Sequence, residues 1–498
     1  MTDTNAQASA PSAEVPRRAW QALVVLLLGM FMALLDTTIV NVALPTIETS
    51  LGASEATLSW IISGYALAFG LALIPAGKIG DRIGHKWVFF TGLALFTLAS
   101  FACGLAQDDL QLVIARIVQG LAGGIFVPAV TAFIQLLFPG QVRGKAFAIM
   151  GAVIGVSTAL GPIAGGLIIE AFGNENGWRG VFWVNLPIGI VGLVAAAFLL
   201  PKRSETEPQP QSGVDWIGLL LVTAGLVALL VPLIEGQDQG WPAWTYVTLA
   251  AGAVLIAAFG AWEVHYTKRG RNPLVPPKLF THPAFTGGTI LALVYFASFT
   301  SIFFTLSLLW QSGLGNSALS SGAVMLPFAI GSIIASAQSN KLTQRLGRTV
   351  LLLGTSFVAI SLIWMWIILA TTDPDGLTGW KLLAPLLIGG LGNGAFIAPN
   401  AQFIVATVDR QDAGAASGVI STMQRIGSAV GIAVIGSVLF GSLTITGPDT
   451  VASGFMHAAA VAMSVSAAFG VIALLLVFAL PKHVDAPGQP VSKQTVAS

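Results

Sequence analysis

The sequence predicts an all-α integral membrane protein with 14 transmembrane helices. Of its 498 residues, 55% are hydrophobic and only 9% are charged, and the mean hydropathy is +0.82, which is far too apolar for a soluble globular protein. The apolar residues gather in runs of about 20, the length that an α-helix needs to cross the hydrocarbon core of a bilayer. The net charge of +1 gives no reason to expect a nucleic-acid partner, and the single cysteine, Cys103, excludes an intrachain disulfide.

Fourteen apolar runs follow one another along the chain, and we expect each to be one transmembrane helix. The boundary between the ninth and tenth runs is the least distinct, because only the polar turn at 311–317 divides them. The first run carries Asp36 and is longer than the apolar part of a signal peptide, so we expect an uncleaved span rather than a secretory or twin-arginine signal. The runs lie at residues 20–47, 57–77, 87–106, 110–137, 146–169, 180–200, 216–234, 243–263, 284–310, 318–339, 349–370, 382–406, 413–440 and 456–480.

The basic residues indicate the orientation of these spans. All but four of the 23 lysines and arginines lie in alternate loops that include both termini. The exceptions are Arg179 and Lys381 in loops on the other side, and Arg116 and Arg425 within spans. Because basic loops stay on the cytoplasmic side, we expect both termini in the cytoplasm. The expected location is the inner (cytoplasmic) membrane of the cell.

The chain also repeats itself. The pattern Lys78-x-x-x-Arg82-x-Gly84 recurs after the tenth span as Lys341-x-x-x-Arg345-x-Gly347, and the glycine-rich segment 123–128 resembles 394–399. Repeats with the same direction through the membrane indicate two parallel six-helix halves. The expected organisation is a cytoplasmic tail (1–18), a first half (19–201), a linker with two inserted helices (202–265), a cytoplasmic loop (266–283), a second half (284–481) and a cytoplasmic tail (482–498).

Five segments are similar to the motifs of one family: 35–45, 77–86, 116–120, 161–166 and 178–189. With them, the whole chain resembles the major facilitator superfamily, and specifically its fourteen-span branch of drug:proton antiporters. Two positions depart from the pattern. Ser157 stands where the antiporter motif usually has glycine, and Gln344 in the second-half loop corresponds to Asp81 in the first.

The resemblance implies a major facilitator fold and a proton-coupled antiporter that exports drugs, antibiotics and dyes by alternating access. We expect the cargo to be amphipathic and cationic or neutral. Two alternatives remain: a dedicated exporter of one endogenous metabolite or self-made antibiotic, and a non-transporting receptor or scaffold. The expected partners are the cargo, protons and the bilayer, with the protein acting as a monomer.

Asp36 is the first candidate for the proton site. It is the only charged residue between Arg18 and Glu48, and an intramembrane charge costs about 3 kcal/mol on insertion scales. One reading is that it only supports helix packing, since Ala33, Val40 and Ala43 on its face are small. The other is a proton carrier, because burial favours the neutral carboxyl whereas a nearby cation favours the ionised form.

Arg116 is the candidate partner of Asp36. Counted from the external loops at about 1.5 Å per residue, Asp36 lies about 18 Å deep and Arg116 about 10 Å, a difference that an arginine side chain can bridge. The alternative is that Arg116 extends outward to the bilayer surface.

Two further motifs are candidates for gating. The loop with Gly77, Lys78, Asp81, Arg82, Gly84 and Lys86 suits a charged latch at the cytoplasmic face, although its charges could serve topology alone. In the fifth span, Gly161, Pro162, Gly165 and Gly166 predict a kink and a close helix contact. The resemblance implies that this contact meets the other half and resists leakage.

Polar residues within other spans are candidates for cargo binding, although such residues often serve only as interhelical hydrogen bonds. Arg425 has no evident acidic partner and could line the cavity, bind an anionic group or bond carbonyls. The sequence has no Walker phosphate loop, metal-ligand cluster or nucleophile motif, so we expect no enzyme activity, no cofactor or metal, and energy from an ion gradient. The candidates are Asn41, Gln119, Asn393, Asn400, Gln424 and Arg425.

Overall fold

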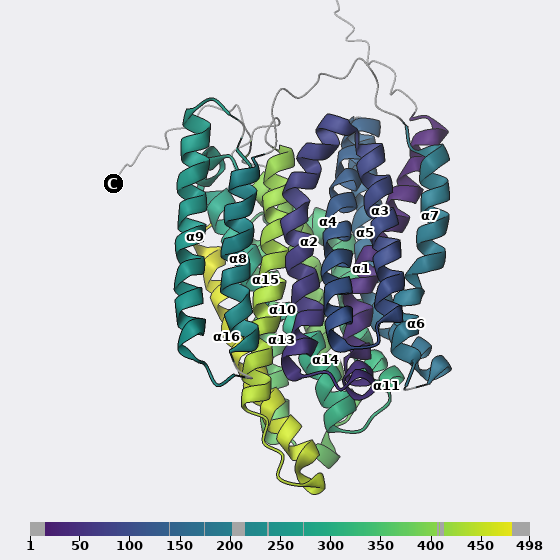
Figure 1. Ribbon diagram of the computed structural model, residues 1–498, viewed down its shortest axis with the longest axis vertical. Coiled ribbons are helices and arrows are strands. Elements are labelled where there is room, and N and C mark those ends of the chain that lie inside the picture. The colour runs from purple at the N-terminus through teal and green to yellow at the C-terminus, as the bar shows by residue number, and fades with distance from the viewer. Residues whose placement is uncertain are drawn as a thin grey trace, which may run out of the picture.

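The computed structural model describes residues 15–138, 140–173, 175–201, 215–236, 239–271, 273–405, 408 and 413–480. Every regular element among them is a helix, and thirteen helices are long and apolar enough to cross a membrane. Figure 1 shows the long helices lying side by side in one bundle. The prediction of an all-α membrane protein is confirmed.

The first group of helices, α1 to α7, contains the first six predicted spans. The fifth span, predicted at 146–169, lies within the 33-residue helix α5. The sixth is not one helix, because it breaks at Val184, where Pro187 lacks the N–H that would bond the Trp183 carbonyl. The bounds are α1 Arg17–Leu51, α2 Glu55–Ile83, α3 His85–Leu105, α4 Asp109–Leu137, α5 Gly140–Phe172, α6 Gly177–Trp183 and α7 Asn185–Leu199.

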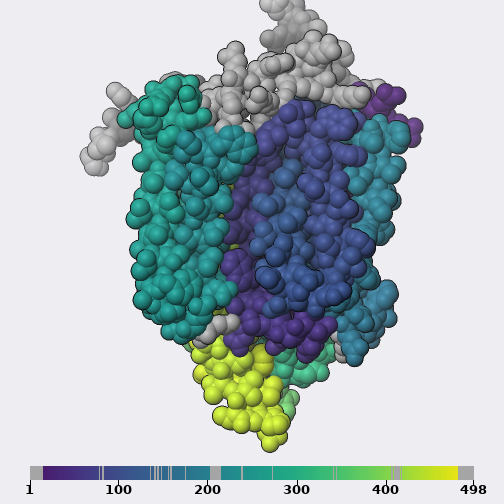
Figure 2. Space-filling model, in the orientation of Figure 1, coloured from purple at the N-terminus to yellow at the C-terminus, as the bar shows by residue number. Residues whose placement is uncertain are grey.

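Helices α8 (Trp216–Glu235) and α9 (Ala243–Lys268) form a hairpin at the edge of the bundle. The inner helix α8 packs against α2 and α15, and its Leu226 and Leu230 lie in one apolar cluster with Ala66 of α2. Only 11% of the apolar 18-residue stretch of α9 is buried inside the protein, as expected for a helix that faces lipid. Figure 2 shows this hairpin as one flank of the molecule.

The second group, α10 to α16, contains the last six spans. The tenth span is broken at Met325, before Pro327, just as the sixth is broken before Pro187. Short turns of 3₁₀ helix, η1 (Pro277–Thr281), η3 (Pro374–Gly376) and η5 (Pro448–Thr450), precede long helices. The bounds are α10 Pro283–Leu308, continued by the π-helical turn η2 Leu309–Gly313, then α11 Ala318–Val324, α12 Leu326–Leu346, α13 Thr349–Thr371, α14 Gly379–Val405, α15 Ala413–Gly441 and α16 Val451–Phe478.

The two groups meet along α1 with α10, α2 with α15, and α5 with α11 and α12. In the later part of α1 every residue from Thr38 to Ile47 is buried, whereas Phe31, Leu34 and Thr37 are partly exposed. The Ser307 hydroxyl of α10 donates a hydrogen bond to the Asn41 carbonyl at 2.6 Å. The groups are therefore tightly closed toward the end of the bundle where α1 finishes, which we call the far face; the end where α1 begins is the near face.

Candidate functional site

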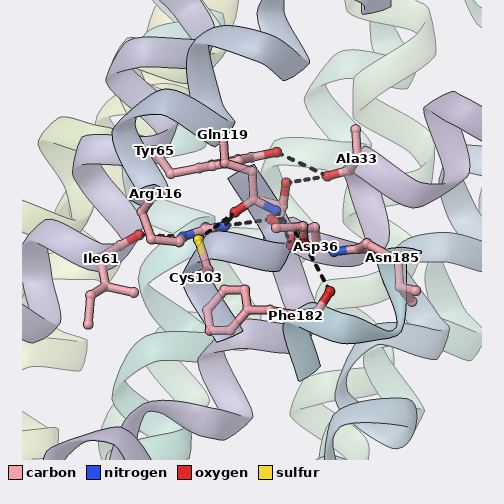
Figure 3. A network of polar contacts seen from close by, with 12 residues as sticks. Ala33, Asp36, Ile61, Tyr65, Cys103, Arg116, Gln119, Phe182 and Asn185 are labelled. Carbon is pink, nitrogen blue, oxygen red and sulfur yellow. Dashed lines mark hydrogen bonds and ion pairs between the residues drawn. The ribbon is translucent and has the colours of Figure 1, made fainter. Parts of the chain in front are cut away.

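The Asp36 carboxylate is the centre of a buried polar network (Figure 3). Its Oδ2 accepts a hydrogen bond from Arg116 Nη1 of α4 at 2.6 Å, which is also an ion pair. Its Oδ1 accepts from Gln119 Nε2 and from Asn185 Nδ2, both at 2.9 Å. All four side chains are at most 1% exposed, so this carboxylate links α1 to α4 and α7 with no contact to bulk water.

Ser100 of α3 completes the network. Its hydroxyl accepts hydrogen bonds from Gln119 at 3.1 Å and Asn185 at 2.9 Å, and it donates to the Phe182 carbonyl at 2.9 Å. Phe182 lies in the last turn of α6, next to the break at Val184. The break in the sixth span thus supplies one acceptor and directs Asn185 to Asp36.

The Arg116 guanidinium is held on every side. Its Nε donates to the Ile61 carbonyl at 3.1 Å and its Nη1 also bonds Gln119 Oε1 at 2.7 Å. The guanidinium carbon lies 4.0 Å from the centre of the Tyr65 ring, and the Tyr65 hydroxyl bonds the Ala33 carbonyl at 3.3 Å. Arg116 therefore points inward to Asp36 and does not extend to the bilayer surface.

This arrangement can bind and release a proton at one place, the Asp36 carboxylate. A buried charge needs a partner, and removing one member of a buried ion pair costs about 3–5 kcal/mol. Protonation of Asp36 would remove the charge that balances Arg116, so the pair has two electrostatic states. Thr37, the next residue along α1, is partly exposed.

Three members of the network were not among the residues predicted from the sequence. Asn185 lies in segment 178–189, which supports the family resemblance, but the sequence assigned it no role. A polar residue two positions before a proline inside an apolar run is the signal that could have identified it. Ser100 and Tyr65 carry no such signal, because serine and tyrosine are common in transmembrane helices.

The predicted cargo-binding asparagines have partners nearby. Asn41 donates to the carbonyl of Thr37 within its own helix at 3.2 Å. In the second group, the Asn393 amide joins Tyr295 and Ser332, each at 3.0 Å. The Asn393 bonds join α14 to α10 and α12, and the role of both asparagines in cargo binding stays a prediction.

Asn400, Gln424 and Arg425 differ in their surroundings. Asn400 donates to the Gly288 carbonyl at 3.3 Å, and within the described chain its Oδ1 has no hydrogen-bond partner. Gln424 and Arg425 are partly exposed on α15. The Arg425 guanidinium lies over the Phe69 ring of α2, 4.2 Å from its centre.

The predicted latch is described only in part. Gly84 has a φ of 99°, which suits glycine, and its N–H bonds the Gly80 carbonyl at the end of α2. Nothing lies within 4 Å of a Cβ placed on Gly77. Lys86 is buried and donates to the carbonyls of Ala197 and Leu200 at 2.7 and 2.8 Å, so it caps α7 within the first group. The side chains of Lys78, Asp81 and Arg82 lie outside the described atoms.

The glycines of the fifth span lie at two helix contacts. A Cβ on Gly161 would overlap Thr38 Oγ1 of α1, and one on Gly165 would meet Ile39 at 3.0 Å. On the other side of α5, a Cβ on Gly166 would meet Leu319 Cα of α11 at 2.6 Å. Between the same helices, a Cβ on Gly322 would overlap the Pro162 carbonyl. Helix α5 thus touches both groups by backbone approach.

Residues 26–432 match the family model described as Major Facilitator Superfamily. The chain is 36% identical over 428 residues to a "Probable actinorhodin transporter" of Streptomyces coelicolor, covering 86% of this chain and 73% of that one. It is 32% identical over 444 residues to a "Tetracenomycin C resistance and export protein" of Streptomyces glaucescens, covering 89% and 80%. It is 32% identical over 474 residues to "Puromycin resistance protein pur8" of Streptomyces alboniger, covering 93% and 91%.

Among solved structures, the chain is similar to the xylose transporter XylE from E. coli in a partially occluded inward open conformation. The TM-score is 0.62 at 13% identity, over 95% of this chain and 100% of that one. It is also similar to an auto inhibited POT family peptide transporter, with a TM-score of 0.68 at 14% identity over 95% and 99% of the two chains. At these identities the likeness shows the fold alone.

Proposed function

The chain belongs to the Major Facilitator Superfamily, and from this premise we propose that it is a proton-coupled antiporter that exports amphipathic small molecules, antibiotics among them. Its relatives include proteins named for antibiotic export or resistance. The observation that carries the proton-coupling part of the proposal is the buried ion pair of Asp36 and Arg116, 2.6 Å apart.

The pair supports proton coupling because its geometry links a titratable group to the packing of three helices. With Asp36 ionised, one oxygen accepts from Arg116 and the other from Gln119 and Asn185. Protonation of Asp36 removes the negative charge that pairs with Arg116. It also places an O–H donor beside the N–H donors of Arg116, Gln119 and Asn185. Protonation is therefore expected to loosen α1 from α4 and α7, and so to favour a different arrangement of the first group.

Alternating access would then be a rocking of the first group, α1 to α7, against the second, α10 to α16. The complete burial of 38–47 in α1 supports a state closed at the far face. In the proposed orientation the near face is cytoplasmic, because most basic residues lie at loops of that side. The inner-membrane location and the monomeric state are parts of the same proposal.

Exchange in proteoliposomes tests the proposal. Asp36→Asn keeps the size of the side chain but cannot take up a proton, so drug transport driven by a proton gradient should be lost while binding and folding persist. Asp215→Asn is the matched control, since Asp215 is another buried carboxylate whose helix-capping bond to Gly218 N asparagine can also accept. Asp36→Asn protein that still transports drug in response to a proton gradient would contradict proton coupling at this residue.

A dedicated exporter of one metabolite is the second candidate. It is favoured by the relatives, each of which is named for a single antibiotic. A panel of unrelated drugs and dyes separates the two, because a multidrug exporter would stimulate proton exchange with several and a dedicated exporter with one. A receptor or scaffold would show no cargo-stimulated proton release at all.

A further inference from the structure

Arg425 extends from the second group of helices onto the first. Its Cβ lies 2.9 Å from the position of a Cβ on Gly70, so α15 and α2 are in close contact here. The neighbouring Thr422 hydroxyl donates to the Gly70 carbonyl at 3.1 Å. The side chain then continues to the Phe69 ring, 4.2 Å from its centre. Arg425 is therefore located at the contact between the two groups.

No anion balances this guanidinium within the part of the chain that the structure describes. Arg425 forms no ion pair and no hydrogen bond with another described residue, and its guanidinium lies on the face of Phe69. Arg116, by contrast, bonds a carboxylate, an amide and a carbonyl. A charged group in an apolar interior is normally paired. The Arg425 guanidinium can therefore still form an ion pair with an acidic group.

The local charge balance supports an anionic ligand. Arg116 lies over Tyr65, the Tyr65 and Phe69 rings are 5.9 Å apart, and Arg425 lies over Phe69. Two guanidinium groups thus flank one aromatic pair, but Asp36 balances only the first. The second is partly exposed, so a molecule that enters between the groups can reach it.

Apolar surface adjoins the charge. Met423 of α15 and Leu293 of α10 are only partly buried, and both pack against the apolar cluster that contains Ile426, the residue after Arg425. A ligand with an acidic group and an apolar body would place the acid on the guanidinium and the body against these side chains.

We propose that Arg425 binds the acidic group of the cargo, and that the preferred cargo is therefore an amphipathic anion, such as a carboxylate, sulfonate or phenolate. This inference rests on the proposed export function, and it replaces the expectation of a cationic or neutral cargo. It also predicts the charge moved per cycle. Exchange of one inward proton for one outward anion moves two charges, whereas exchange for a neutral molecule moves one.

Two dyes that share a skeleton test the inference, namely anilinonaphthalene and its sulfonate, which carries one negative charge. Affinity is measured with purified full-length protein in lipid nanodiscs, and the charge moved is measured in proteoliposomes on a solid-supported membrane. Arg425→Gln should weaken sulfonate binding at least about tenfold, because a charge-assisted hydrogen bond is lost. Binding of the neutral dye should change less than about twofold, and Arg425→Lys should retain part of the sulfonate affinity.

Arg271→Gln is the control, because Arg271 is exposed and also lies near an aromatic ring, 5.6 Å from the centre of Tyr266. The anion assignment is overturned if the wild-type protein binds only the neutral dye, or if Arg425→Gln weakens both dyes equally; export as such then stands. Wild-type protein that binds and moves neither dye contradicts the anion inference, whereas export itself is contradicted only if no drug or dye of the panel stimulates proton exchange. Thermal unfolding of each variant identifies any loss of folding. If Arg425→Gln does not fold, the affinities of Arg425→Lys for the two dyes decide whether the anion binds at this residue.

Discussion

Asn185 and Arg116 approach the Asp36 carboxylate from opposite sides, and each takes a different oxygen (Figure 3). The arginine comes from the first third of the long helix α4, whereas the asparagine begins α7, directly after the break in the sixth span. One carboxylate therefore closes both a charged link to α4 and a neutral link to α7. These two links make different predictions.

Asn185→Leu removes the neutral link and leaves the ion pair in place. A hydrogen bond to a charged group contributes about 1.5–3 kcal/mol, so the rate of drug and proton exchange should fall at least about tenfold, with the protein still folded. The measurement is substrate-stimulated proton release from purified protein. Ser361→Ala, which removes a buried hydrogen bond to the Pro385 carbonyl in the second group, is the comparison, and equal losses in the two variants would show that the Asn185 bond has no special part in coupling.

Arg116→Gln removes the charged link. The buried Asp36 would lose its cation, so the free energy of unfolding should fall by about 3–5 kcal/mol. Adding Asp36→Asn to this variant should restore much of that stability, since no uncompensated charge remains, but exchange should stay absent. Thermal unfolding in detergent of the two single variants and the double variant measures the coupling energy. Additive losses would mean that the pair is not an energetic unit.

Most of the fold could be predicted from the sequence because the bilayer sets the length of each apolar run. The breaks at Val184 and Met325 could not, since each lies inside an uninterrupted apolar run and depends on where a proline falls relative to the preceding carbonyls. The sixth span, predicted at 180–200, is one membrane-length apolar segment, Gly177–Leu199, whose helix is interrupted near its beginning at Val184.

The site divides in the same way. Asp36 and Arg116 stand out as charged residues in apolar helices, and the cost of burying them predicts that they meet. Gln119, predicted as a cargo contact, bonds Asp36 as well. Ser100 and Asn185 join them because α3 and α7 bring them to the same carboxylate; the proline after Asn185 marks that position, but no feature of the sequence marks Ser100. Conversely, Asn393 also stands out as a polar residue in an apolar helix, but its partners are the uncharged Tyr295 and Ser332.

Gly166→Val should open the far face. A side chain there would overlap the backbone of Leu319 and Ala318, with 2.6 Å to Leu319 Cα, so α5 and α11 would have to separate. We expect a proton leak in proteoliposomes without drug, because this contact closes the groups against each other. Gly151→Ala in the same helix is the control, since nothing lies within 4 Å of its Cβ. A tight, fully active Gly166→Val protein would show that the glycine contact is not a seal.

The hairpin α8–α9 should depend on one hydrogen bond to the first group. Trp60 Nε1 of α2 donates to Glu235 Oε1 at the end of α8 at 2.8 Å, while the Ser437 hydroxyl of α15 bonds the Leu233 carbonyl at 2.7 Å. The end of α8 is thus tied to both groups. Trp60→Phe keeps the ring and removes the donor, so about 1–2 kcal/mol of local stability should be lost. Hydrogen exchange should become faster in the last turn of α8, and it should not change there in Trp244→Phe, whose indole bonds only the exposed Gln239 within the hairpin. Unchanged exchange in Trp60→Phe would mean that the apolar contacts of Leu226 and Leu230 suffice to hold α8 against α2.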